Sequence, residues 1–96
     1  MDAKQAYEDK TEAQLKQLNA RIDLLRAKAE EAKADAKVEY AERLEELEER
    51  RDEAEARLQR LESSGRQAWR ELKGGVDNAM AELERSVSKA LSRFDL

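Results

Sequence analysis

The apolar residues of the segment 44–61 recur at alternating steps of three and four, and this spacing constrains the fold more than any other feature. In an α-helix it places them on one narrow stripe, the a/d seam of a coiled coil. Most of the residues around the stripe are charged. A helix of this kind is not stable alone, because its apolar stripe would face water. The pattern therefore predicts an all-α protein in which this helix packs on other helices.

The composition favours long helices over a mixed globular core. Charged residues make up 44% of the 96 residues, and aromatic residues make up only 4%. The chain has no proline, so no position is barred from a helix, and it has neither cysteine nor histidine. Without these side chains there are no disulfides, no thiolate zinc ligands and no histidine general base. The sequence therefore predicts a protein that is not an enzyme and that has no catalytic, metal or cofactor site.

Charge and hydropathy together predict a cytoplasmic protein that does not bind nucleic acid. The net charge of −4 opposes binding to the phosphate backbone of DNA or RNA. No stretch approaches the roughly 20 apolar residues of a membrane span, and the first ten residues lack the apolar centre of a signal peptide.

The seam predicts one long first helix over residues 2–62. Asp2, followed three residues later by Gln5, resembles a capping box at the start of this helix. Between residues 27 and 36 the seam positions are occupied only by alanine, and the seam then continues into the segment 44–61. We expect its bulky members to form the contact between subunits of an oligomer: Leu15, Leu18, Ile22, Leu25, Leu44, Leu47, Leu58 and Leu61.

Residues 63–65, Ser-Ser-Gly, form the one break that the sequence predicts, because glycine favours the left-handed conformation that often ends a helix. After this turn, residues 66–94 are expected to form a shorter amphipathic helix, whose apolar residues follow an eleven-residue period. Its apolar face consists of Trp69, Leu72, Val76, Met80, Leu83, Val87, Leu91 and Phe94. The favoured arrangement is an antiparallel hairpin with residues 34–62, and the alternative is one continuous helix in a parallel coiled coil.

This hairpin would leave the N-terminal half of the long helix without a partner in its own chain. We therefore expect residues 1–96 to form a single coiled-coil domain that assembles with copies of itself, as a closed homo-oligomer or as an open assembly. The main functional hypothesis is a structural or interaction protein without enzymatic activity. A second hypothesis is binding to a membrane surface through residues 66–94, although their polar face lacks the Lys/Arg excess usual in such helices. A third is a holdase-like chaperone that uses the same apolar face.

Four stretches carry a resemblance to a known family: residues 3–10 (AKQAYEDK), 64–76 (SGRQAWRELKGGV), 79–83 (AMAEL) and 92–94 (SRF). They resemble a family of short bacterial coiled-coil domain-containing proteins, and the resemblance covers nearly the whole chain. Most members are uncharacterised, and some cyanobacterial members are associated with general stress responses. The resemblance therefore implies a stress-related role, and it implies no catalytic or ligand residues because the family defines none.

Overall fold

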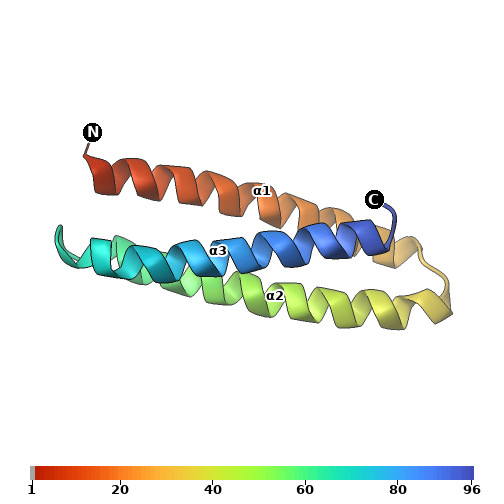
Figure 1. Cartoon of the computed structure of the whole chain (residues 1–96). Coiled ribbons are helices and arrows are strands. Elements are labelled where there is room, and N and C mark those ends of the chain that lie inside the picture. The colour runs from red at the N-terminus through yellow and green to blue at the C-terminus, as the bar shows by residue number, and fades with distance from the viewer. Residues whose placement is uncertain (1) are drawn as a thin grey trace.

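Three helices make up residues 2–96, and each runs antiparallel to the next along the chain. The computed structural model describes residues 2–96, which contain α1 (Ala3–Glu31), α2 (Ala34–Glu62) and α3 (Ala68–Arg93). The helices lie side by side, with the α1–α2 turn at one end and the α2–α3 turn at the other (Figure 1). The whole measures 50 × 20 × 17 Å, the proportions of a slender three-helix bundle. The prediction of an all-α protein is confirmed.

One apolar core runs along the bundle and receives side chains from all three helices. Ile22 and Leu25 of α1, Leu61 of α2 and Leu83 of α3 are fully buried in it. The interface between α2 and α3 is the most extensive, and α1 packs against both of these helices. Each helix has therefore buried its apolar stripe against the other two, as an amphipathic helix must.

The prediction of one helix over residues 2–62 is wrong. The chain leaves the helix at Ala32 and Lys33, which are extended with ψ angles of 152° and 158°, and it then turns back into α2. A helix of this length would be about 90 Å long and would leave the apolar stripe of its first half in water. The break falls where the seam is only alanine, so interrupting the seam there sacrifices little buried area.

The turn predicted after Glu62 is present, and the hairpin that it forms excludes one continuous helix for the chain. The left-handed glycine expected to end the helix is wrong, because Gly65 has no positive φ and Ser63 caps α2 in a right-handed helical conformation. Helix α2 ends at Glu62, where the N–H of Ser63 donates to the carbonyl oxygen of Gln59 at 3.0 Å. Helix α3 begins at Ala68, two residues later than predicted, and its last residue is Arg93. It folds back antiparallel along α2, as the favoured arrangement required (Figure 1).

Candidate interaction surface

The seam residues that were expected to join subunits pack within the core of a single copy of the chain. Seven of the eight seam leucines and isoleucines are buried in the core of one bundle, and Leu44 is half-buried at its edge. Obligatory self-association was predicted because the N-terminal half seemed to lack an intrachain partner. That premise is wrong, since α1 packs on α2 and α3 of its own chain. While the bundle is closed, this seam offers no apolar surface to a second copy.

The apolar face of α3 is covered in the same way. Trp69, Val76, Met80, Leu83 and Val87 are buried. The three remaining members of the predicted face are partly buried against the same core: Leu72, Leu91 and Phe94. A lipid surface or an unfolded client protein could reach this face only after the helices separate. None of the helices in residues 2–96 is long and apolar enough to cross a membrane.

A shallow groove lies between α2 and α3, near the middle and C-terminal part of α3. Its floor contains Leu47 and Ala90, whose side chains are buried. Polar side chains from both helices line its walls: Arg43, Glu46, Arg50, Glu82, Arg85, Ser86 and Lys89. We refer to these nine residues as the α2/α3 groove.

Positive charge predominates in the α2/α3 groove, with four basic side chains against two carboxylates. Arg50 lies between the two carboxylates, at 3.4 Å from Glu46 and 3.4 Å from Glu82, and its Nε atom is buried without a hydrogen-bond partner. Arg85 and Lys89 are exposed and have no ion pair within the described part of the chain. The groove therefore carries a net charge of about +2 at neutral pH on a protein whose total is −4.

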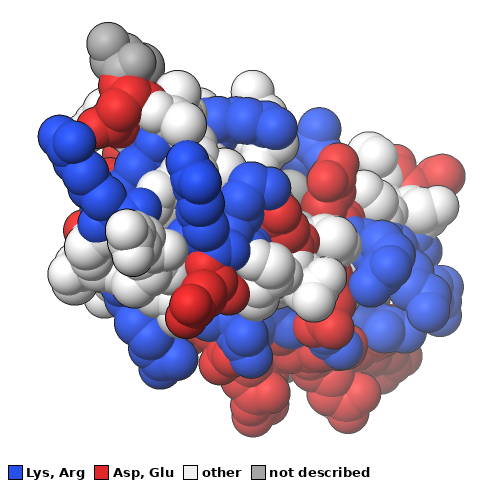
Figure 2. Space-filling view, turned by 60° about the vertical axis from the view of Figure 1, so that its left-hand side comes forward, with Lys and Arg blue, Asp and Glu red and all other residues white. Residues whose placement is uncertain are grey.

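The outer face of α2 has the opposite charge. Glu42, Glu45, Glu49 and Asp52 follow each other at steps of three and four, so they share one face of the helix, and all four are exposed. Figure 2 shows acidic side chains gathered along the lower edge of the bundle, at the height where α2 lies in Figure 1. The α2/α3 groove and this face of α2 therefore carry opposite charge.

A polar cluster joins the N-terminal parts of α1 and α3. The hydroxyl of Tyr7 donates to Oδ1 of Asp77 at 2.5 Å, and Lys73 pairs with the other carboxylate oxygen at 3.0 Å. Burial, the hydrogen bond to Asp77 and the charge of that carboxylate raise the pKa of Tyr7 far above its usual value, so the phenol stays protonated. The ring of Tyr7 lies 5.8 Å from that of Trp69. This cluster fixes α1 on α3 and needs no ligand to explain it.

A second polar cluster closes the same end of the bundle. Lys4 pairs with Glu8 at 2.7 Å and donates to the carbonyl oxygen of Glu62 at 3.0 Å, which satisfies one of the free carbonyls at the C-terminus of α2. A hydrogen bond shared with the Glu12 carboxyl, desolvation and the nearby negative charges raise the pKa of Glu62 to about 7. The cluster therefore changes its charge near neutral pH.

Neither the groove nor the polar clusters were predicted from the sequence. The clusters join residues up to 70 positions apart, and a helical period reveals only neighbours on one helix. The groove did leave a signal, since Arg43 and Arg50 are seven residues apart and Arg85 and Lys89 are four apart, each pair on one side of its helix.

In residues 2–96, no group of three or more acidic side chains is arranged to hold a metal ion. No family model, no curated protein and no solved structure matches this chain. The α2/α3 groove is therefore judged on its geometry and charge alone.

Proposed function

We propose that this protein is a non-enzymatic interaction protein that binds an acidic partner segment in the α2/α3 groove. The single observation that carries the proposal is the excess of basic side chains in a groove between two helices, on a protein that is acidic as a whole. Charge complementarity of this kind guides association and sets the register of the partner.

The dimensions of the groove suit a short helical segment. On α2 its basic residues run from Arg43 to Arg50, which is about 10 Å along a helix axis at 1.5 Å per residue. A partner with two or three turns of helix and carboxylates spaced by three or four residues would place those carboxylates opposite Arg85 and Lys89. The resemblance to the bacterial coiled-coil family extends the proposal to a stress-related role in the cytoplasm.

The test uses a fluorescently labelled glutamate peptide of about twelve residues, a length sufficient for roughly three helical turns. Its binding is measured by fluorescence anisotropy, with an uncharged Gly/Ser peptide of equal length as the control probe. We expect binding of the glutamate peptide alone, weakening markedly between about 50 and 300 mM NaCl because exposed charges are screened by salt.

Two double variants with the same change in charge separate the groove from general electrostatics. Arg85→Gln with Lys89→Gln removes the two unpaired charges of the groove, and Lys16→Gln with Arg66→Gln removes two exposed charges elsewhere. We expect the first variant to weaken binding about tenfold, since each exposed ion pair contributes roughly 0.5–1 kcal/mol. Equal losses in both variants, or equal binding of the uncharged peptide, would contradict the proposal.

A further inference from the structure

The junction between α1 and α2 contains no residue that ends a helix. Residues 27–37 (AKAEEAKADAK) consist of Ala, Lys, Glu and Asp only, and the first three rank among the better helix formers. The chain nevertheless leaves the helix at Ala32 (φ −72°, ψ 152°) and Lys33 (φ −70°, ψ 158°). Both φ values already suit a helix, so rotation of two ψ angles would join α1 and α2 into one helix over residues 3–62.

The two helix ends at this junction are weakly capped. Lys33, the N-cap of α2, makes no side-chain cap hydrogen bond. Lys28 and Asp35 complement the helix dipoles, but Glu30 and Glu31 at the C-terminus of α1 and Lys33 at the N-terminus of α2 oppose them. In one continuous helix neither end would exist, and Glu30 and Lys33 would stand three residues apart on the same face.

The other turn is held much more firmly. The Ser64 hydroxyl donates to the carbonyl oxygen of Leu61 at 2.5 Å, and the backbone N–H of Ser64 donates to the same oxygen at 3.0 Å. Leu61 and Trp69 on either side of this turn are buried. By contrast, none of the described residues between positions 25 and 47 is fully buried. The bundle should therefore open at Ala32–Lys33, and α2 and α3 should stay together.

The seam stays on one face of the helix across the junction. Ala29, Ala32 and Ala36 continue the three–four spacing of α1, and Tyr40 and Leu44 follow in α2 after one extra step of four. A straightened helix would therefore present a single apolar stripe from its start to its end. Alanine at the centre would let two such helices approach closely where they pass each other.

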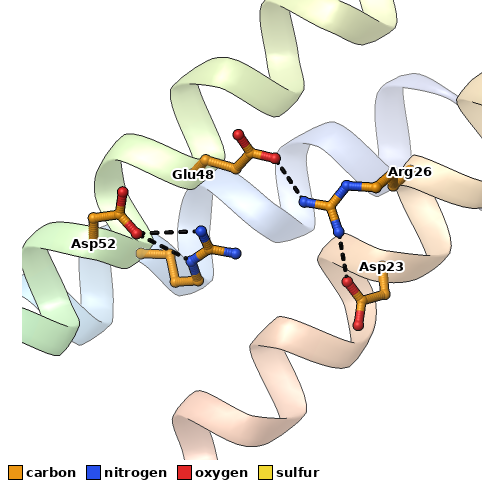
Figure 3. Close-up of polar contacts among 5 residues, drawn as sticks. Asp23, Arg26, Glu48 and Asp52 are labelled. Atoms are coloured by element: carbon orange, nitrogen blue, oxygen red, sulfur yellow. Dashed lines mark hydrogen bonds and ion pairs between the residues drawn. The ribbon is translucent and has the colours of Figure 1, made fainter.

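We infer that two copies of the chain exchange α1. In the exchanged dimer, residues 3–62 of each copy form one straight helix, and α1 of each copy packs on α2 and α3 of the other. Every contact of α1 is made again, now between chains. Figure 3 shows one of them: Arg26 of α1, which also pairs with Asp23, reaches Glu48 of α2 at 2.6 Å. Such an exchange of identical elements is a low-cost route to a symmetric dimer.

The charges at the junction suit a second copy. Residues 27–37 contain three acidic and three basic side chains, so two straight helices that meet there carry no net charge toward each other. The contacts of α1 are the same in both forms, so the difference between monomer and dimer depends on the junction and on the protein concentration. This exchange uses the core rather than the α2/α3 groove, and it stands independently of the proposed function.

Lys33→Pro tests the exchange because it suits one form only. In the monomer, Lys33 has the φ of a proline, its N–H donates no backbone hydrogen bond at the turn, and Ala32 is extended as a residue before proline should be. In the straight helix, proline would lie in the interior, where it is strongly disfavoured. Lys33→Ala is the matched control, because it favours the straight helix.

Each full-length protein is unfolded, refolded at about 1 mM and analysed by size-exclusion chromatography with light scattering. We expect dimer in the wild type and more dimer in Lys33→Ala. With two prolines per dimer, Lys33→Pro should raise the dissociation constant by more than about a thousandfold, and the protein should elute as a helical monomer. Dimerisation of Lys33→Pro to the wild-type extent, or monomer alone for both wild type and Lys33→Ala, overturns the inference.

A thiol crosslinker identifies the chains that are in contact, because the protein has no cysteine of its own. The single variants Arg26→Cys and Glu48→Cys are mixed, refolded together at the same concentration and treated with a bismaleimide, whose span replaces the two long side chains that meet at 2.6 Å and that a disulfide would be too short to bridge. We expect a crosslinked pair that contains one of each variant, and its loss when both carry Lys33→Pro. Dimers that form without this mixed crosslink would mean that another surface joins the chains, which would also overturn the inference.

Discussion

Replacing Leu25 by alanine tests directly whether the α1 seam packs inside one chain. Leu25 is 0% exposed, whereas its neighbour Leu24 is 45% exposed. The two residues have the same side chain and lie on the same helix, so Leu24→Ala is a matched control. Only Leu25→Ala removes apolar atoms from the core shared with α2 and α3.

The expected difference between the two variants is large for a protein of this size. A buried Leu→Ala substitution costs about 2–5 kcal/mol, because transfer free energy is lost and a cavity remains. We expect about 3 kcal/mol for Leu25→Ala, which corresponds to a fall in Tm of about 10–20 °C in a domain of roughly 100 residues. Leu24→Ala should change the free energy of unfolding by no more than about 0.5 kcal/mol, as is usual at the surface.

Urea unfolding followed by circular dichroism measures both variants, starting from freshly isolated monomer. The Tm of the wild type is measured in parallel over a hundredfold range of micromolar concentrations. A seam inside one chain predicts a constant Tm, whereas a seam between subunits predicts a Tm that rises with concentration. Equal effects of the two substitutions, or such a rise, would refute the intrachain packing of α1.

Two further predictions concern pH and lipid. The pKa of Glu62 is raised in the folded state to about 7, so its contribution to stability is present below its unfolded pKa and is lost as the pH rises through 7. Glu62→Gln should therefore be more stable than the wild type at pH 8, by about 0.5–1 kcal/mol after solvent screening, and should show a smaller change in urea midpoint between pH 5 and 8. An unchanged pH dependence would contradict this, and Glu49→Gln, at an exposed site, is the control. Intact protein should not co-float with anionic vesicles or show a blue shift of Trp69 fluorescence, because Trp69 is already buried; either signal would favour the membrane hypothesis.

The sequence predicted which residues are buried better than it predicted what they pack against. The three–four spacing identified Leu15, Leu18, Ile22 and Leu25 as one apolar stripe, and all four are in the core. The spacing is the same whether the stripe meets another subunit or another helix of the same chain. Only the position of the turns decides whether the stripe packs on another subunit or on its own chain. The argument for a subunit contact through α1 was therefore wrong, because it assumed that no turn precedes residue 62.

The two turns differ in how clearly the sequence encodes them. Ser63 and the two residues after it carry the serine and glycine signals of a helix end, and the chain turns there. Ala32 and Lys33 carry no such signal, and yet both are extended. Their conformation therefore follows from packing of the whole bundle rather than from local preference. The α2/α3 groove was also beyond prediction, since it requires the relative placement of two helices.

The position of Trp69 makes its intrinsic fluorescence a probe of whether α1 is docked on the other two helices. Trp69 is the only tryptophan, it lies on α3, and its ring is 5.8 Å from that of Tyr7 near the start of α1. The other aromatic pair, Tyr40 and Phe94, joins α2 to α3 at the opposite end. Emission from Trp69 therefore reports whether the first helix is docked, from its own chain or from another. Stopped-flow measurements can follow the undocking of α1 in the native sequence, without an attached label.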